Sequence, residues 1–117
     1  MSEPRVIVTG GRKYDDHRTI RRVLALLAPD VVLVHGDAPG ADRIARDYWR
    51  TIGHFDEPHP AGWGQYGKAA GLVRNSEMAH LGASLCIAFP GGTGTEDMVS
   101  KARGRGIPVL RVEGEAW

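Results

Sequence analysis

The sequence predicts an α/β fold, a Rossmann-like open and mostly parallel sheet with helices on both faces. Short β-branched runs alternate with amphipathic, helix-like segments along the chain, and three of these runs are followed at once by a glycine-rich turn. Because strand–helix–strand crossovers are right-handed, a parallel sheet accommodates this alternation most simply. The chain has 117 residues, and we expect a single domain over residues 1–117.

The first part of the chain contains two strand-like runs and a helix between them. Residues 6–8 and 31–34 are apolar runs typical of strands that are buried on both faces. Between these runs, apolar residues recur with the period of a helix: Ile20, Val23, Leu24 and Leu27. Asp15 or Asp16 is expected to cap the start of this helix, and Pro29 is expected to stop it.

The rest of the chain continues the alternation with one irregular segment. A helix over about 40–51 is predicted to turn five residues toward the core: Ala41, Ile44, Ala45, Tyr48 and Trp49. Glycines and prolines interrupt residues 52–67, which leave room for a short edge strand over 54–57. We then expect a helix over 68–81 with Gly82 at its end. A strand over 84–89, a helix ending near 103 and a last strand over 108–112 follow.

Charge and composition argue against several protein classes. The 15 Lys and Arg residues against 14 Asp and Glu residues give a net charge of +1, so nucleic-acid binding through bulk charge is not expected. No apolar run reaches the ~18 residues of a membrane span, and residues 1–5 show no signal-peptide pattern. The single Cys86 lies in a strand-like run, where inert packing is expected. These features predict a cytoplasmic protein.

The chain contains sixteen glycines, and many of them gather where strands are predicted to end. Three clusters, 9–12, 35–40 and 90–95, fall at the carboxyl edge of the predicted sheet, where open α/β sheets bind ligands. Residues 90–95 place glycines and threonines at a helix N-terminus, whose free N–H groups attract phosphate. The predicted ligand-contacting residues in these clusters are Gly10, Gly11, Arg12, Gly36, Asp37, Pro90, Gly91, Gly92, Thr93, Gly94 and Thr95. The alternative is that the glycines only shape tight turns.

Basic side chains accompany these clusters. Arg12 follows the first strand and Arg74 lies in the third predicted helix, so each is a candidate for bidentate phosphate binding. Lys68 would add a point charge. The alternative is that these residues are solvated surface cations.

Other polar and aromatic residues have two interpretations each. Asp37 would contact a ribose hydroxyl or activate water, or else form a turn or helix cap; Asn75 would read a base edge or bond to the backbone. Asp42, one turn into a helix, is expected only to complement the helix dipole. Trp63 and Tyr66 would stack on a base or pack beneath a loop.

Two nucleotide motifs and a metal site are missing from the sequence. Residues 90–95 lack the Gly-Lys-Ser/Thr of a P-loop, and the Gly10-Gly11 turn lacks the spacing of a dinucleotide fingerprint. The histidines show no spacing typical of metal ligands. We therefore predict no metal and no cofactor.

Four segments together resemble the YspA-like, cpYpsA-related branch of the SLOG superfamily, and the resemblance spans nearly the whole chain: 8–12, 35–42, 71–78 and 89–95. The resemblance implies a modified Rossmann fold that binds nucleotides or nucleotide-derived ligands. It also relates the chain to the LOG phosphoribohydrolases and to the DNA-processing Smf/DprA proteins.

The chain departs from the LOG pattern at one position. In LOG enzymes, the segment that resembles residues 90–95 continues to a catalytic glutamate three residues after the threonine, and Met98 stands at that place here. A thioether can neither accept a proton nor stabilise an oxocarbenium ion. Glu96 and Asp97 are adjacent, but on a helix they point about 200° and 100° away from Met98.

Three functional hypotheses follow. The first is a sensor or carrier that binds a nucleotide or nucleotide-derived ligand. The second is an enzyme that cleaves the N-glycosidic bond of a nucleotide, with Asp37 and then Glu96 as candidate catalytic carboxylates. The third is a DNA-processing accessory protein, which the near-neutral charge disfavours. A homodimer or higher oligomer is also considered, because relatives commonly pair through helices and the terminal Trp117 needs cover.

Overall fold

A computed structural model describes residues 3–114, except for the side chain of Lys68, and contains one five-stranded sheet. The strands are β1 (Arg5–Thr9), β2 (Val32–His35), β3 (Asp56–Pro58), β4 (Leu85–Ala88) and β5 (Val109–Arg111). Their order across the sheet is β3-β2-β1-β4-β5, and every neighbouring pair is parallel. The open parallel sheet predicted from the sequence is thereby confirmed.

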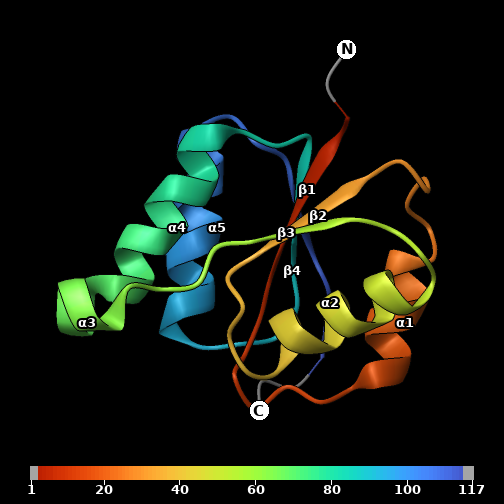
Figure 1. Cartoon of the computed structure of the whole chain (residues 1–117), viewed down its shortest axis with the longest axis horizontal. Helices are drawn as coiled ribbons and strands as arrows, with labels where there is room; N and C mark the ends of the chain where they lie inside the picture. The colour runs from red at the N-terminus through yellow and green to blue at the C-terminus, as the bar shows by residue number, and fades with distance from the viewer. Residues whose placement is uncertain (1–2, 115–117) are drawn as a thin grey trace.

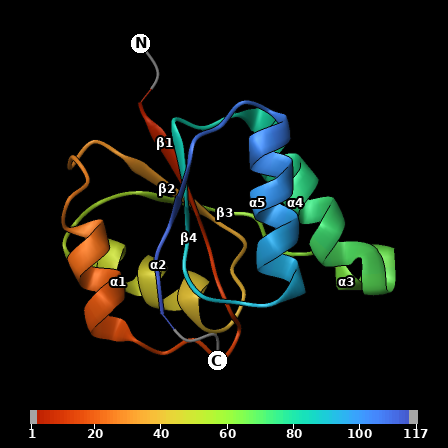
Figure 2. The ribbon, with the colours of Figure 1, turned by 180° about the vertical axis from the view of Figure 1, so that it is seen from behind.

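Helices cover both faces of this sheet, as Figures 1 and 2 show from opposite sides. On one face lie α1 (His17–Leu24) and α2 (Ala41–Thr51), and on the other lie α4 (Ala70–Leu81) and α5 (Thr93–Gly104). A short helix, α3 (Trp63–Tyr66), and a single 3₁₀ turn, η1 (Gly67–Ala69), precede α4 and stand at its outer side. The predicted Rossmann-like arrangement is therefore observed.

The two faces of the sheet bury separate apolar clusters. Successive side chains of a strand point to opposite faces, so Val6 and Val8 pack toward α1 and α2 whereas Ile7 packs toward α4 and α5. Trp49 of α2 is buried in the first cluster, and Met98 of α5 is buried in the second. Burial on both faces explains why the strands appear in the sequence as short, continuous apolar runs.

The predicted cap of the first helix is observed, but its predicted end is wrong. The Asp16 carboxylate accepts a hydrogen bond from the Thr19 N–H at 3.0 Å and caps α1. The helix ends at Leu24, several residues before Pro29. The N–H groups of Leu26 and Leu27 bond to carbonyls three residues earlier, so the chain tightens into turns before the proline.

The irregular segment contains the expected edge strand slightly later than predicted. β3 pairs with β2 over residues 56–58, and Pro58 is tolerated there because an edge strand needs only one set of ladder bonds. The helix expected over 68–81 begins as α4 at Ala70, after the 3₁₀ turn, and ends at Leu81. Gly82 follows it as the expected C-terminal glycine, and its φ of 85° suits that residue type.

The strand order places a topological switch point between β1 and β4. From β1 the chain moves to β2 and β3 on one side, and later returns to β4 and β5 on the other. Ligands of open α/β sheets bind at the carboxyl ends of strands at such a point. No helix within residues 3–114 is long and apolar enough to cross a membrane. The expectations that rest on Ser2 and Trp117 fall outside the described residues.

Candidate functional site

Three glycine clusters meet at the carboxyl edge and are joined by backbone hydrogen bonds. The Gly11 N–H donates to the Pro90 carbonyl at 2.9 Å, which joins the loop after β1 to the loop after β4. The Gly11 carbonyl accepts from the Ala41 N–H at 3.2 Å, which joins the first loop to the start of α2. The three loops therefore form one connected surface.

Close approach of the loops requires glycine at specific positions. A Cβ on Gly91 would lie 2.6 Å from the Gly11 nitrogen, and one on Gly40 would lie 2.2 Å from the Gly11 carbonyl oxygen. Gly40 also has a φ of 83°. These glycines allow close packing between loops, a structural role that differs from the tight-turn alternative raised by the sequence.

Two other glycines have a different environment. A Cβ on Gly92 or Gly94 would meet no atom within 4 Å. Both residues lie at the start of α5, the first as its N-cap and the second in its first turn. The backbone here has open space beside it, so packing between loops does not explain these two glycines.

A cavity of about 450 Å³ lies between these loops and α4, at the switch point between β1 and β4. Of the predicted ligand residues, those that line it are Gly10, Gly11, Arg12, Arg74, Asn75, Gly92, Thr93, Gly94 and Thr95. Pro90 and Gly91 do not line it and instead contact Gly11 of the loop after β1. Ala38 and Asp42 line the cavity too, so the structure brings together residues from all four segments of the sequence pattern.

A smaller cavity of about 220 Å³ adjoins the first. The two share Arg12, Ala38, Trp63 and Arg74 in their walls. The smaller cavity is lined by Gly36, Asp37 and Pro39 of the loop after β2, by Pro60 and Ala61 of the loop after β3, and by Arg43 of α2. The two cavities are therefore neighbours that share part of their lining.

Arg74 stands in the wall between the two cavities. Its Nη1 donates to the Gly36 carbonyl at 2.6 Å, and its Nε donates to Asn75 Oδ1 at 2.9 Å. A Cβ on Gly36 would lie 2.1 Å from Nη1, so glycine is needed for the guanidinium to reach this place. Burial lowers the pKa of Arg74, whereas the nearby Asp42 carboxyl acts in the opposite direction.

The remaining basic residues surround the opening. Arg12 is exposed and lines both cavities, and Lys13 lines the larger one. The side chain of Lys68 is outside the described part of the structure. Arg12, Lys13 and Arg74 give the larger cavity a positive rim.

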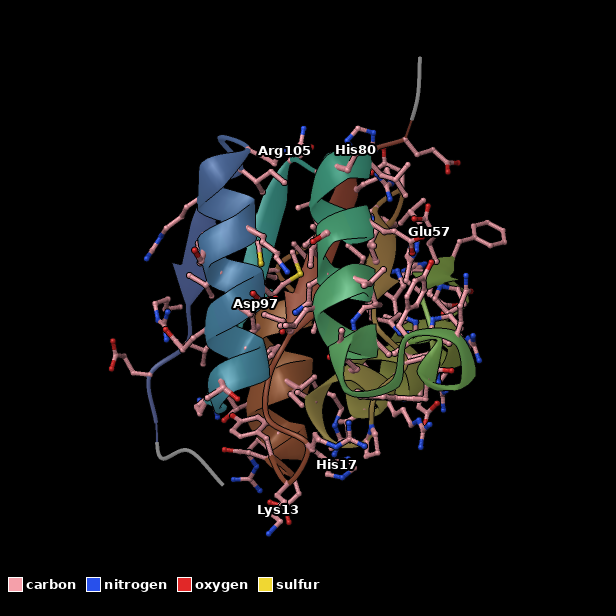
Figure 3. All side chains as sticks on the ribbon, turned by 90° about the vertical axis from the view of Figure 1, so that its left-hand side faces the viewer. Lys13, His17, Glu57, His80, Asp97 and Arg105 are labelled. Atoms are coloured by element: carbon pink, nitrogen blue, oxygen red, sulfur yellow. The ribbon has the colours of Figure 1, made fainter. Side chains whose placement is uncertain are left out.

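Asn75 is buried between α4 and α5. Its Nδ2 donates to the Gly94 carbonyl at 3.2 Å and to Asp97 Oδ2 at 3.0 Å. Figure 3 shows the two helices side by side, with Asp97 between them. The sequence suggested that Asn75 either reads a base edge or bonds to the backbone, and the structure contains the backbone bond. That bond holds the first turn of α5 beside the cavity.

The structure separates the two predicted catalytic carboxylates from the larger cavity. Asp37 has a φ of 53°, accepts a 2.6 Å bond from Arg46 and lines only the smaller cavity. Glu96 is exposed and accepts a 2.5 Å bond from Arg111. Met98 is buried in the core beneath α5. A catalytic role for Asp37 or Glu96 stays a prediction.

Asp42 lines the larger cavity, a position that sequence reasoning missed. Its side chain is buried, and Oδ2 accepts hydrogen bonds from the N–H groups of Gly36 at 2.9 Å and Ala38 at 3.4 Å. Burial raises the pKa of Asp42, and nearby Arg74 opposes that shift. The interpretation of Asp42 as only a partner of the helix dipole is therefore incomplete. Its position in the first turn of a helix that directly follows a glycine-rich loop was the available signal.

A second polar network, also missed from the sequence, supports the loop after β2. His35 is fully buried, and its Nδ1 accepts from the Asp37 N–H at 3.1 Å. Nε2 therefore carries the proton and donates to Asp56 at 2.7 Å. Burial opposes ionisation of Asp56, but hydrogen bonds from Arg50 and His35 outweigh it and lower the pKa of Asp56.

Cys86 is a buried free thiol. Burial raises the pKa of the Cys86 thiol to about 12, so the group stays protonated near neutral pH. Within residues 3–114, no group of three or more His, Cys, Asp or Glu side chains is arranged to hold a metal ion.

Comparisons with known proteins agree with the motif pattern. The family model of the YspA, cpYpsA-related SLOG family matches residues 4–66, which include the loops after β1 and β2. The chain is also 42% identical over 118 residues to the Gene 61 protein of Mycobacterium phage D29, covering 91% of this chain and 94% of that protein. Because this family model matches more than half of the chain, the chain belongs to the YspA, cpYpsA-related SLOG family.

Proposed function

We propose that the protein binds a nucleotide or nucleotide-derived ligand in the larger cavity and serves as a sensor or carrier of it. The observation that carries this proposal is the convergence of the loops after β1 and β4 with the first turn of α5 around one cavity. Membership of the SLOG family is consistent with a nucleotide-related ligand.

The phosphate would lie at the start of α5. The first N–H groups of a helix have no partners within it, and α5 is twelve residues long. Gly92 and Gly94 leave room for an anion to approach the backbone closely. Arg12 and Arg74 would neutralise its charge from the cavity rim.

The base would lie toward Trp63. The Trp63 side chain is 54% exposed and lines both cavities, so its ring is available for stacking. Stacking on an aromatic ring tolerates different bases, so the contacts proposed here fix the position of the phosphate and leave the identity of the base open.

N-glycosidic hydrolysis remains the alternative function. It requires a carboxylate near the anomeric carbon of the ribose, where positive charge develops. Glu96 lines neither cavity, and Met98 lies in the core. These positions favour ligand binding over hydrolysis by the LOG arrangement.

A thermal-shift panel tests the proposal. The purified protein is heated with nucleoside mono-, di- and triphosphates, NAD, ADP-ribose and cyclic nucleotides, and each mixture is assayed for released base. A ligand at 100 times its dissociation constant should add about 2.7 kcal/mol, or several degrees for a domain of this size. A shift without base release supports the sensor or carrier, and base release supports the hydrolase. The absence of any shift contradicts the binding proposal.

A pair of charge variants locates the site. Arg12→Gln removes an exposed rim cation without disturbing the core, and affinity for the best ligand should fall about tenfold or more. Arg105→Gln is the matched control, because Arg105 is an exposed cation at the opposite end of α5 (Figure 3). Equal loss of affinity in both variants would indicate nonspecific charge attraction rather than this site.

A further inference from the structure

The Asp42 carboxyl is the buried acidic group that faces the ligand cavity. Asp42 is 5% exposed and lines the larger cavity from the first turn of α2. Both hydrogen bonds that the structure gives this side chain reach Oδ2. No hydrogen bond from a described residue reaches Oδ1, and Asp42 takes part in no described ion pair within 4.0 Å.

The position of Oδ1 follows from the burial pattern. Every fully enclosed side-chain nitrogen or oxygen in the described part of the chain has a hydrogen-bond partner. Oδ1 has none among these residues, so it is not fully enclosed, and the open space beside Asp42 is the larger cavity. This oxygen is an acceptor directed at whatever occupies that space.

Burial of this carboxylate is costly in the free protein. A charge removed from water needs hydrogen bonds or an opposite charge. Arg74 lies near enough to attract this carboxylate but forms no ion pair with it within 4.0 Å, and Oδ1 accepts no hydrogen bond from a described residue. Bracing of the loop over residues 36–38 uses only Oδ2 and would be served equally by an uncharged amide. The second oxygen is therefore the unexplained part of the arrangement.

We infer that Asp42 accepts a hydrogen bond from a ribose hydroxyl of the bound ligand. This inference rests on the phosphate binding proposed above and adds a sugar contact to it. A hydroxyl group supplies the missing donor by itself. A metal ion, in contrast, would require several further ligands. In a nucleotide, the ribose lies next to the 5′-phosphate. Asp42 and the first turn of α5 line the same cavity, which suits this connection. Asp42 then determines that the site takes sugar phosphates rather than phosphate alone.

The variant Asp42→Asn tests this role while preserving the fold. The amide oxygen would replace Oδ2 as acceptor from Gly36 and Ala38, which turns the amide NH₂ toward the cavity. The acceptor that faces the ligand becomes a donor, and a buried charge is removed. We expect the melting temperature to stay equal or to rise.

The assay compares inorganic phosphate with ribose 5-phosphate, so the unidentified base does not matter. In the wild-type protein, ribose 5-phosphate should bind more tightly than phosphate. In Asp42→Asn, the advantage of ribose 5-phosphate should shrink about tenfold or more, whereas phosphate should bind equally or slightly more tightly because a negative charge is lost. Asp47→Asn on the same helix, where the side chain is 66% exposed, should change neither affinity.

The outcomes separate the two proposals. If neither probe binds to the wild-type protein, the proposed phosphate site fails. If both bind and Asp42→Asn keeps the full ribose advantage, phosphate binding stands and the role of Asp42 is overturned.

A wild-type measurement covers the case of a variant that does not fold. The Gly36 and Ala38 amide resonances report on the hydrogen bonds to Oδ2. They should shift with ribose 5-phosphate and remain still with inorganic phosphate at equal occupancy. Equal responses to both probes would contradict a sugar contact at Asp42.

Discussion

Asp42 and Asp56 are two acidic residues of one fold whose ionisation is affected in opposite directions. Asp56 is held by the Arg50 guanidinium and by His35, and these bonds lower its pKa despite partial burial. Asp42 is more deeply buried and bonds only to backbone N–H groups, so desolvation raises its pKa. The Asp56 carboxylate therefore stabilises the fold, whereas the Asp42 carboxylate costs stability, so its presence calls for another explanation.

The Asp56→Asn variant should lose stability in a pH-dependent way. The folded pKa of Asp56 is lower than its ordinary value of 3.8, so its contribution is fully present above that value and is lost as pH falls through the folded pKa. We expect the variant to be about 1–2 kcal/mol less stable at pH 7, with a smaller difference toward pH 3. Urea unfolding of both proteins across this range measures the difference. A gap that stays constant with pH would contradict an ionic contribution.

At the scale of elements, the glycines at the carboxyl edge divide into two kinds. Gly40 and Gly91 allow backbone segments to touch, and a side chain there would collide with Gly11. Gly92 and Gly94 have open space beside them at the start of α5. Glycine in a helix lowers stability relative to alanine, and Gly94 occurs at the place where the larger cavity meets the first turn of α5.

Gly94→Ala should separate stability from function. A methyl group in the first turn of α5 should stabilise the helix by up to about 1 kcal/mol, because glycine has the larger unfolded-state entropy. The same methyl group would project where the phosphate is proposed to bind, so affinity should fall about tenfold or more. Melting temperature and ligand titration give the two readouts.

Gly104→Ala is the control for that prediction. Gly104 ends the same helix, and a Cβ there would also meet no atom within 4 Å. This variant should keep full affinity. Comparable loss of binding in both variants would place the ligand elsewhere.

Gly91→Ala should have the opposite effect on stability. The new Cβ would lie 2.1 Å from Thr95 Oγ1 and 2.6 Å from the Gly11 nitrogen, so the loops after β1 and β4 would be forced apart. We expect a loss of about 1–3 kcal/mol in the free energy of unfolding, as for other overpacked sites. A melting temperature equal to that of the wild-type protein would show that the loops do not pack as described.

At the scale of the whole molecule, the sequence predicted features that depend on local order. Short segments of the sequence determine the alternation of strands and helices, the Asp16 cap and the glycine clusters at strand ends. The gathering of these clusters at one edge of the sheet then follows from its parallel topology. The strand order was not predicted, because pairing of β1 with β4 joins residues about 80 positions apart. The roles of Asp42 and His35 were missed for the same reason, since their burial depends on elements far along the chain.

The most direct test of the central proposal is a titration of the ¹⁵N-labelled protein with the nucleotide that gives the largest thermal shift. Glycine amides form a distinct group of resonances, and the chain carries them both at the cavity and far from it. The proposal predicts that the amides of Gly11, Gly92 and Gly94 shift with increasing ligand while those of Gly53 and Gly104 stay in place. Shifts confined to Gly53 and Gly104, with the cavity glycines unchanged, would contradict it.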